Sequence, residues 1–126
     1  MKPELLIWAG GLFHVAFVVF HLTFWKLFRW DAELAKLTSL NRATVQVLNL
    51  ALTVVFVIFS YLSLAHAPEM VGTDLGRSLT LAIAAFWYLR AVLQVAFFGL
   101  RKTLSVVFFV VVLAGGTLYA YAWIVS

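Results

Sequence analysis

Four long apolar runs, separated by short polar segments, take up almost the whole chain. They cover residues 5–25, 44–65, 79–100 and 104–125. Each run is close to the roughly 20 residues that an α-helix needs to cross the hydrocarbon core of a bilayer. The pattern predicts an all-α polytopic membrane protein, an antiparallel bundle of four transmembrane helices that forms a single integral membrane domain over residues 1–126.

Composition agrees with this fold class. Hydrophobic residues make up 65% of the chain and charged residues only 11%. So small a polar fraction cannot cover a soluble globule of this size, which excludes a separate soluble domain. The sequence contains no cysteine, so disulfides, thiolate metal sites and cysteine nucleophiles are excluded as well.

The segment between the first two runs is the most highly charged part of the chain. Within residues 26–42, leucines and Trp30 recur every three or four positions, while most charged residues fall between them. This is the period of a helix with one apolar face. It predicts a short amphipathic helix on the cytoplasmic membrane surface, and the alternative is a plain polar connector with i,i+4 pairs such as Arg29 and Glu33. Ser39 or Asn41 is the expected N-cap of the second transmembrane helix.

Basic residues gather in two loops that lie on the same side of the predicted membrane. The loops after the first and third runs hold six of the nine basic residues, which are Lys26, Arg29, Lys36, Arg42, Arg101 and Lys102. By the positive-inside rule both loops are cytoplasmic. We therefore expect a protein of the bacterial inner (plasma) membrane with its N- and C-termini outward.

An arginine in the middle of the third run is the strongest functional signal. Arg90 lies roughly 16 Å along the helix from the outer start of its run, with Gln94 one turn deeper. A charge at this depth costs at least about 2.5 kcal/mol, so it usually faces protein or water and has a partner. We therefore expect Arg90 to be shielded from lipid by other polar groups.

The first two runs also carry polar pairs. In each pair the two residues are three or seven positions apart, which places them on one helix face. If these faces turn inward, they meet the third run between the midplane and the cytoplasmic side. We therefore expect one ligand-binding site formed by Arg90, Gln94, His21, His14, Asn49 and Gln46.

Such a site offers a fixed positive charge and no intramembrane carboxylate. It suits an anionic or amphipathic small molecule, such as a lipid headgroup, a carboxylate or a quinone-like carbonyl, because a guanidinium requires an acceptor. Binding or transport is the expected function, and the histidines leave proton linkage open. The alternatives are an accessory subunit of a larger membrane complex and a small redox or lipid-modifying enzyme. In a purely structural interpretation, Arg90 bonds Asn49, Gln46 and backbone carbonyls and fixes helix register.

The sequence identifies no cofactor and no metal site. His14 and His21 lie on one helix and His66 lies near the outer surface, so a bis-histidine haem within this chain is not expected, although one histidine could ligate haem or copper in a complex. No metal-ligand spacing is present. The absence of a nucleophile motif and of a glycine-rich phosphate loop favours a binding role over an enzymatic one. The expected partners are membrane lipid and a hydrophobic or anionic small molecule. A homodimer or a membrane-complex partner stays open, and nucleic acid is not expected.

Two glycine pairs predict a helix contact. Gly10 and Gly11 in the first run, and Gly115 and Gly116 in the fourth, fall in the outer half of two antiparallel helices. Small residues allow helix backbones to approach closely in membranes. We therefore expect the first and fourth helices to pack tightly at these positions.

Overall fold

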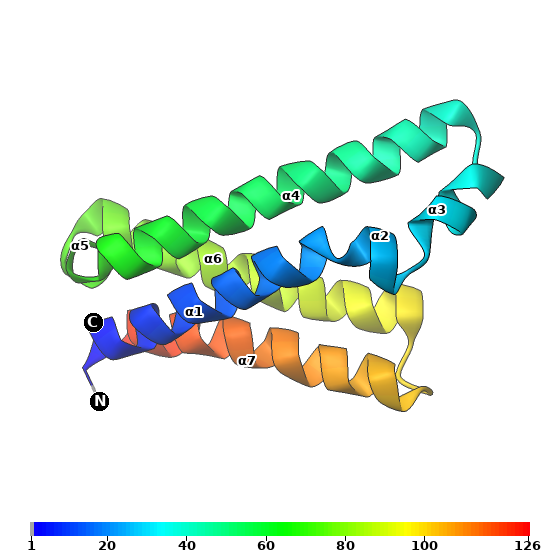
Figure 1. The fold of residues 1–126 in the computed structure, drawn as a ribbon. Coiled ribbons are helices and arrows are strands. Elements are labelled where there is room, and N and C mark those ends of the chain that lie inside the picture. Colours follow the sequence, from blue (N-terminus) through cyan, green and yellow to red (C-terminus); the bar gives the residue numbers. More distant parts are fainter. Residues whose placement is uncertain (1) are drawn as a thin grey trace.

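The computed structural model describes residues 2–126, and four long helices dominate it (Figure 1). They are α1 (Pro3–Leu22), α4 (Ser39–Ala65), α6 (Asp74–Leu93) and α7 (Thr103–Val125). Helix α6 continues into a π-helical turn, η2 (Gln94–Phe98). All four are long and apolar enough to cross a membrane. The described residues contain no strand, so the all-α prediction is confirmed.

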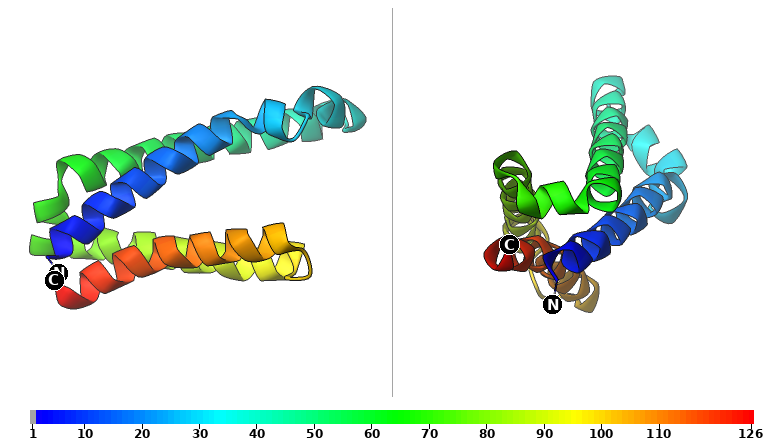
Figure 2. Two further views of the ribbon diagram at one scale, coloured as in Figure 1. Left: turned by 60° about the horizontal axis from the view of Figure 1, so that its bottom comes forward. Right: turned by 90° about the vertical axis from the view of Figure 1, so that its left-hand side faces the viewer.

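The four helices form two antiparallel hairpins that diverge as a wedge (Figure 2). Helix α1 packs along α4, and α6 packs along α7. A further contact between α1 and α7 joins the hairpins, whereas α4 and α6 make no comparable contact. The wedge is closed at the end that holds both termini and the short helix α5 (Ala67–Gly72). The opposite, open end carries both basic loops (Figure 1), so the predicted bundle is closed at one end only.

Glycines allow the close packing of α1 against α7 at the closed end. A Cβ atom on Gly10 would lie 2.5 Å from the ring of Tyr119, and one on Gly115 would lie 2.3 Å from the ring of Phe13. Since both contacts join α1 to α7, the predicted approach of the first and fourth helices is confirmed. The second glycine of each pair instead faces α4 or α6, so the two pairs serve three interfaces.

The connector between α1 and α4 differs from the single amphipathic helix that its pattern predicts. It forms two short helices, α2 (Phe24–Leu27) and α3 (Trp30–Glu33), followed by a 3₁₀ turn, η1 (Leu34–Lys36). The break lies at Arg29, whose φ of 53° is in the left-handed region and so ends the right-handed helix. Leu34 is nevertheless buried, so part of the apolar stripe does face the protein.

Threonines set the starts of two long helices. The hydroxyl of Thr38 accepts a hydrogen bond from the backbone N–H of Asn41, so Thr38 caps α4 in place of the predicted Ser39 or Asn41. Thr73 caps α6 in the same way. Helix α6 therefore begins at Asp74, five residues before the apolar run, because the polar residues that follow the cap also take helical conformation.

Candidate functional site

A cavity of about 700 Å³ lies between the diverging hairpins. All four long helices and the α1–α4 connector contribute to its wall. Its volume is within the range of roughly 300–1,000 Å³ that is typical of small-molecule sites. About half of the lining residues are aromatic, namely Phe17, Phe20, Phe24, Phe28, Trp30, Phe56, Phe86, Trp87, Phe97, Phe98 and Phe108.

Four of the six predicted site residues line this cavity. His21 comes from α1, Asn49 from α4, and Arg90 and Gln94 from α6 and its π-helical extension. Lys102, which the sequence analysis did not include, lines the cavity as well. No aspartate or glutamate within residues 2–126 contributes to the wall. The charged groups of the cavity are therefore all positive.

Arg90 is bonded within its own helix. Its Nη1 donates to Oε1 of Gln94 at 2.9 Å, and the ring of Phe98 lies 6.0 Å from its Cζ. Neither of the two ion pairs in the described part of the chain involves Arg90. A guanidinium has more N–H donors than this one bond uses. Donors therefore remain for an acceptor in the cavity.

Gln94 connects Arg90 to α7. While its Oε1 accepts from Arg90, its Nε2 donates to Oγ of Ser105 at 2.8 Å. Ser105 in turn donates to the backbone carbonyl of Gly99. Both ends of the amide are thus occupied, which holds the guanidinium in place. Ser105 could not be predicted from the sequence, because a single serine at the start of an apolar run gives no signal.

His21 and Asn49 contribute further polar groups from the other hairpin. Nδ1 of His21 lies 2.8 Å from the carbonyl oxygen of Phe17. Since a carbonyl can only accept, Nδ1 is the donor and Nε2 of the neutral ring keeps its lone pair. Nδ2 of Asn49 donates to the backbone oxygen of His21 at 3.1 Å and so ties α4 to α1. Asn49 therefore bonds α1, and not Arg90 as in the structural interpretation.

The structure places His14 outside this cavity, in a buried network at the closed side. Its Nε2 accepts from the indole N–H of Trp87 at 2.9 Å. Its Nδ1 lies 2.8 Å from the carbonyl of Gly10 and 3.0 Å from the hydroxyl of Tyr119, which also bonds Ser63 at 2.6 Å. Both ring nitrogens are thus occupied. The network takes one side chain from each of the four long helices, which suits a structural role.

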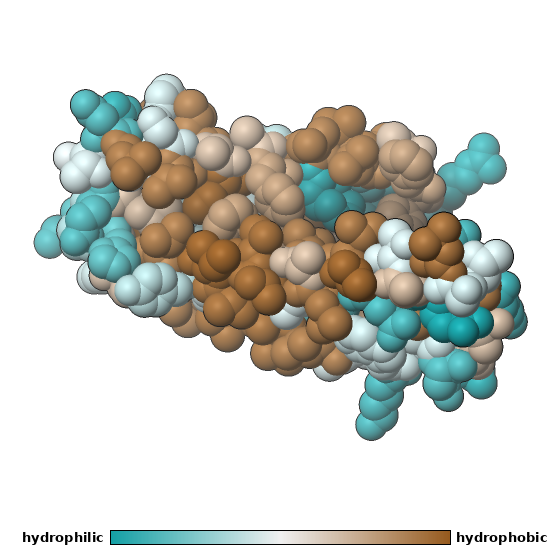
Figure 3. Space-filling view, turned by 90° about the horizontal axis from the view of Figure 1, so that it is seen from above, coloured by the Kyte–Doolittle hydropathy of each residue, from teal (hydrophilic) through white to brown (hydrophobic). Residues whose placement is uncertain are grey.

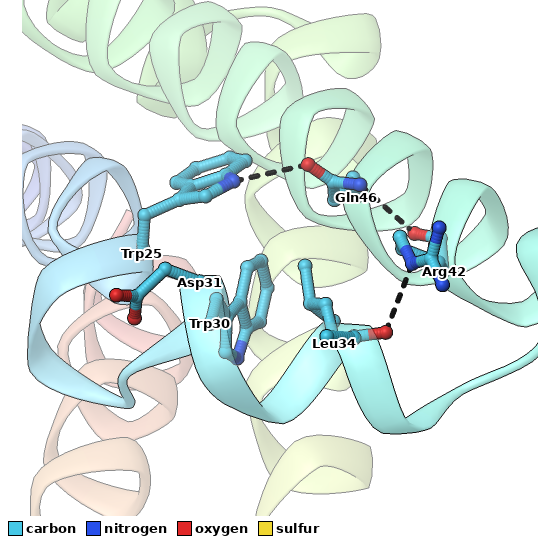
Figure 4. A pocket seen from close by; sticks show the side chains of 7 residues that line it. Trp25, Trp30, Asp31, Leu34, Arg42 and Gln46 are labelled. Atoms are coloured by element: carbon cyan, nitrogen blue, oxygen red, sulfur yellow. Dashed lines mark hydrogen bonds between the residues drawn. The ribbon is translucent and has the colours of Figure 1, made fainter.

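The structure places Gln46 in a second, smaller cavity of about 410 Å³ under the connector (Figure 4). Its Oε1 accepts from the indole N–H of Trp25 at 3.0 Å, and its Nε2 donates to the backbone carbonyl of Arg42 at 3.1 Å. Nε of Arg42 donates to the carbonyl of Leu34 at 3.0 Å. These bonds fasten the connector to the first turns of α4, away from Arg90.

The phenylalanine wall is the largest feature of the site that sequence analysis did not identify. Phe17, Phe20, Phe24 and Phe28 are spaced by three and four residues and all line the cavity. This periodicity is visible in the sequence. However, neighbouring positions are also apolar, so the pattern does not distinguish a cavity face from a lipid face.

No family model, curated protein or solved structure matches this chain. Its function has therefore to be inferred from the cavity, since a helical fold by itself carries little functional information. The cavity combines a fixed guanidinium, an imidazole with a free acceptor and a largely aromatic wall. These groups can hold a molecule that has a small anionic part and an apolar body.

Proposed function

We propose that this protein spans the bacterial inner membrane four times and binds an anionic amphipathic molecule beside Arg90, for retention or transport. The four apolar helices support membrane insertion. So do large apolar side chains that are more than half exposed, which lipid solvates and water does not. Examples along the helices are Leu12, Val19, Leu48, Leu89 and Val110. The basic loops at the open end support a cytoplasmic position for that end.

The uncompensated charge of Arg90 carries the proposal. A charge within the hydrocarbon region usually has a polar partner, and the partner of the half-buried Arg90 within residues 2–126 is the neutral amide of Gln94. A carboxylate or phosphate bound beside Arg90 would supply the missing counter-charge. It would also accept bonds from the free guanidinium donors in a bidentate geometry. An anion therefore fits this site better than a neutral carbonyl does.

The aromatic wall indicates that the rest of the ligand is apolar. Rings from both hairpins, such as Phe17, Phe56 and Phe108, surround the space beside Arg90. A small hydrophilic ion would leave this apolar surface without contacts, whereas a hydrocarbon body would cover it. The proposed ligand thus has one anionic group and one hydrophobic part.

Binding of isotopically labelled hexadecanoate to the protein in phosphatidylcholine nanodiscs tests the proposal. Arg90→Gln should weaken binding about tenfold or more, because a hydrogen bond to a charged group contributes about 1.5–3 kcal/mol. Arg77→Gln is the matched control, since it is the same change in the same helix. Arg77 lies at the closed end, where it bonds Ser126 and Trp123, and its replacement should leave binding unchanged.

Circular dichroism and size-exclusion profiles establish that each variant is folded. If the Arg90→Gln protein does not fold, Arg90→Lys provides the test, because it keeps the charge and loses the planar fork of donors. We expect Arg90→Lys to bind hexadecanoate more weakly than the wild type. Wild-type affinity in a folded Arg90→Gln protein would remove the anion site, and wild-type affinity in a folded Arg90→Lys protein would remove the bidentate contact with the guanidinium.

A further inference from the structure

We propose that the ligand is a single-chain amphiphile that enters from the membrane, with its apolar tail leaving the cavity sideways between α4 and α6 into the acyl-chain region. This inference rests on the proposed function, because it takes Arg90 as the partner of the anionic headgroup. It adds the class of ligand and the route by which the ligand reaches the site.

The opening lies between α4 and α6, which contact each other through aromatic side chains toward the closed end, such as Phe56 of α4 and Trp87 of α6. Helix α4 packs along α1, and α6 packs along α7. The backbones of α4 and α6 do not approach each other to a comparable extent. The cavity residues along this opening are apolar, with Val45, Leu48 and Leu52 on α4, and Phe86 on α6 and Phe97 on its π-helical turn. Figure 3 looks onto this side of the molecule and shows a hydrophilic recess between hydrophobic ridges. These five apolar residues form a frame around the opening, and the polar groups of the cavity can be reached through it.

The exposure of the frame residues indicates whether lipid or water surrounds them. Leu48 is 63% exposed and Phe97 is 80% exposed. An entrance for a water-soluble ligand has no need of such residues, and water would solvate them poorly. Hydrocarbon chains solvate them well. The frame is therefore suited to an entrance that opens into lipid.

The depth of Arg90 and the packing around it determine the direction of the tail. Arg90 lies about 12 Å along the helix from Phe98, the end of η2, so a headgroup bound there is below the interface. Toward the closed end the path is filled by fully buried side chains, with Trp87 stacked on Phe56 at 5.3 Å. Toward the open end the tail would reach Lys102 and water. The sideways exit is the one that keeps a long tail in an apolar medium.

The cavity also limits the form of the ligand. Its volume of about 700 Å³ holds a headgroup and the first part of a chain, and the remainder lies among the lipids. A carboxylate and a phosphate monoester share the chemistry that Arg90 requires, which is a small anion with acceptor oxygens. Hexadecanoate and hexadecyl phosphate are therefore the two probes, and the tighter binder identifies the headgroup.

Photo-crosslinking with hexadecanoate that carries a mid-chain diazirine tests the route directly. In nanodiscs we expect Arg90-dependent labelling of frame residues on α4 and α6, as mapped by mass spectrometry. Labelling that is equally strong in the Arg90→Gln protein reports general lipid contact and is subtracted. Arg90-dependent labels confined to Lys102 and Trp30, or to the closed-end core, would overturn the lateral route.

A matched pair of substitutions tests the opening itself. Leu48 and Val47 are neighbours on α4 and both are 63% exposed, but only Leu48 lines the cavity. Leu48→Trp should narrow the opening and weaken hexadecanoate binding several-fold, while binding of the short hexanoate is kept. Val47→Trp should change neither, since Val47 does not line the cavity.

The outcomes separate this inference from the proposed function. If hexanoate and hexadecanoate both bind through Arg90 and Leu48→Trp affects them equally or not at all, the lateral route is wrong and the anion site stands. If neither the carboxylates nor hexadecyl phosphate binds in an Arg90-dependent way, the anion site itself is wrong. Loss of hexadecanoate binding alone in Leu48→Trp supports the lateral route.

Discussion

The side chain that faces Arg90 is an amide, and this determines the charge of the cavity. A carboxylate in its place would accept the same N–H and would also cancel the positive charge. With Gln94 the bond of 2.9 Å orients the guanidinium and leaves its charge uncompensated. Ser105 holds the other end of the amide, so Gln94 acts as a positioning residue for Arg90.

Gln94→Glu should therefore weaken hexadecanoate binding about as much as Arg90→Gln does, because the new carboxylate would pair with Arg90 inside the protein. The fold should be retained, since the two side chains have nearly the same shape. Gln94→Met is the control, because it removes the amide without adding a charge and should weaken binding less. Wild-type binding in the Gln94→Glu protein would show that the charge of Arg90 is not used by the ligand.

The two histidines of α1 show that spacing along a helix does not predict which tertiary neighbours a side chain has. His14 and His21 are seven residues apart on one face, and this spacing predicted that both belong to one site. In the structure His21 borders the cavity, whereas His14 is bonded to Trp87 and lies near Tyr119. The partners that separate them come from α6 and α7, which are distant in sequence. Periodicity on α1 carries no information about those neighbours.

At the scale of helices, the wedge depends on how closely its closed end is packed. Gly10 and Gly115 bring α1 against α7, and Gly76 does the same for α6 against α5. At each of these positions an added Cβ would overlap with atoms of the facing helix, because the nearest atom is closer than van der Waals contact allows. The hairpins are thus held at one end, and they diverge where the glycines end and the phenylalanines begin.

Gly115→Ala should destabilise the protein by about 1–3 kcal/mol, the usual cost of overpacking, because its Cβ would lie 2.3 Å from the ring of Phe13. Gly72→Ala is the control, since nothing lies within 4 Å of its added Cβ and alanine favours helix. Unfolding in detergent with increasing sodium dodecyl sulfate measures both. Equal stability of the two variants would contradict tight packing of α1 on α7.

The connector shows a similar division between pattern and structure. Its leucine spacing predicted one amphipathic helix, and the segment does consist largely of helical turns. The left-handed conformation of Arg29 divides it. The bonds of Gln46 to Trp25 and Arg42 then hold the connector against α4. Such contacts depend on the position of α4, which local spacing does not encode.

For the whole molecule, the arrangement of charge predicts orientation. Both basic loops lie at the open end and both termini lie at the closed end (Figure 1). The positive-inside rule predicts that the open end faces the cytoplasm. Arg90 and its cavity would then lie in the cytoplasmic half of the membrane.

Single cysteines can report this orientation, because the chain has none of its own. In intact spheroplasts, a membrane-impermeant maleimide should label Ser126→Cys. It should label Lys102→Cys only after the membrane is permeabilised, since this residue lies in a basic loop. The reverse pattern would show that the protein is inserted in the opposite direction. Labelling of both before permeabilisation would contradict the four-span topology.

The sequence by itself determined the four apolar helices, the clustering of basic loops and the position of each polar residue along its helix. These features depend on local hydrophobicity, length and helical rise. Only the tertiary structure decided that the hairpins diverge, that His21 and Asn49 face the same cavity as Arg90, and that His14 and Gln46 do not. Helices that are apolar on almost every side have no preferred face. Their rotation and tilt are therefore set by packing against distant segments, through glycines, aromatic rings and a few hydrogen bonds.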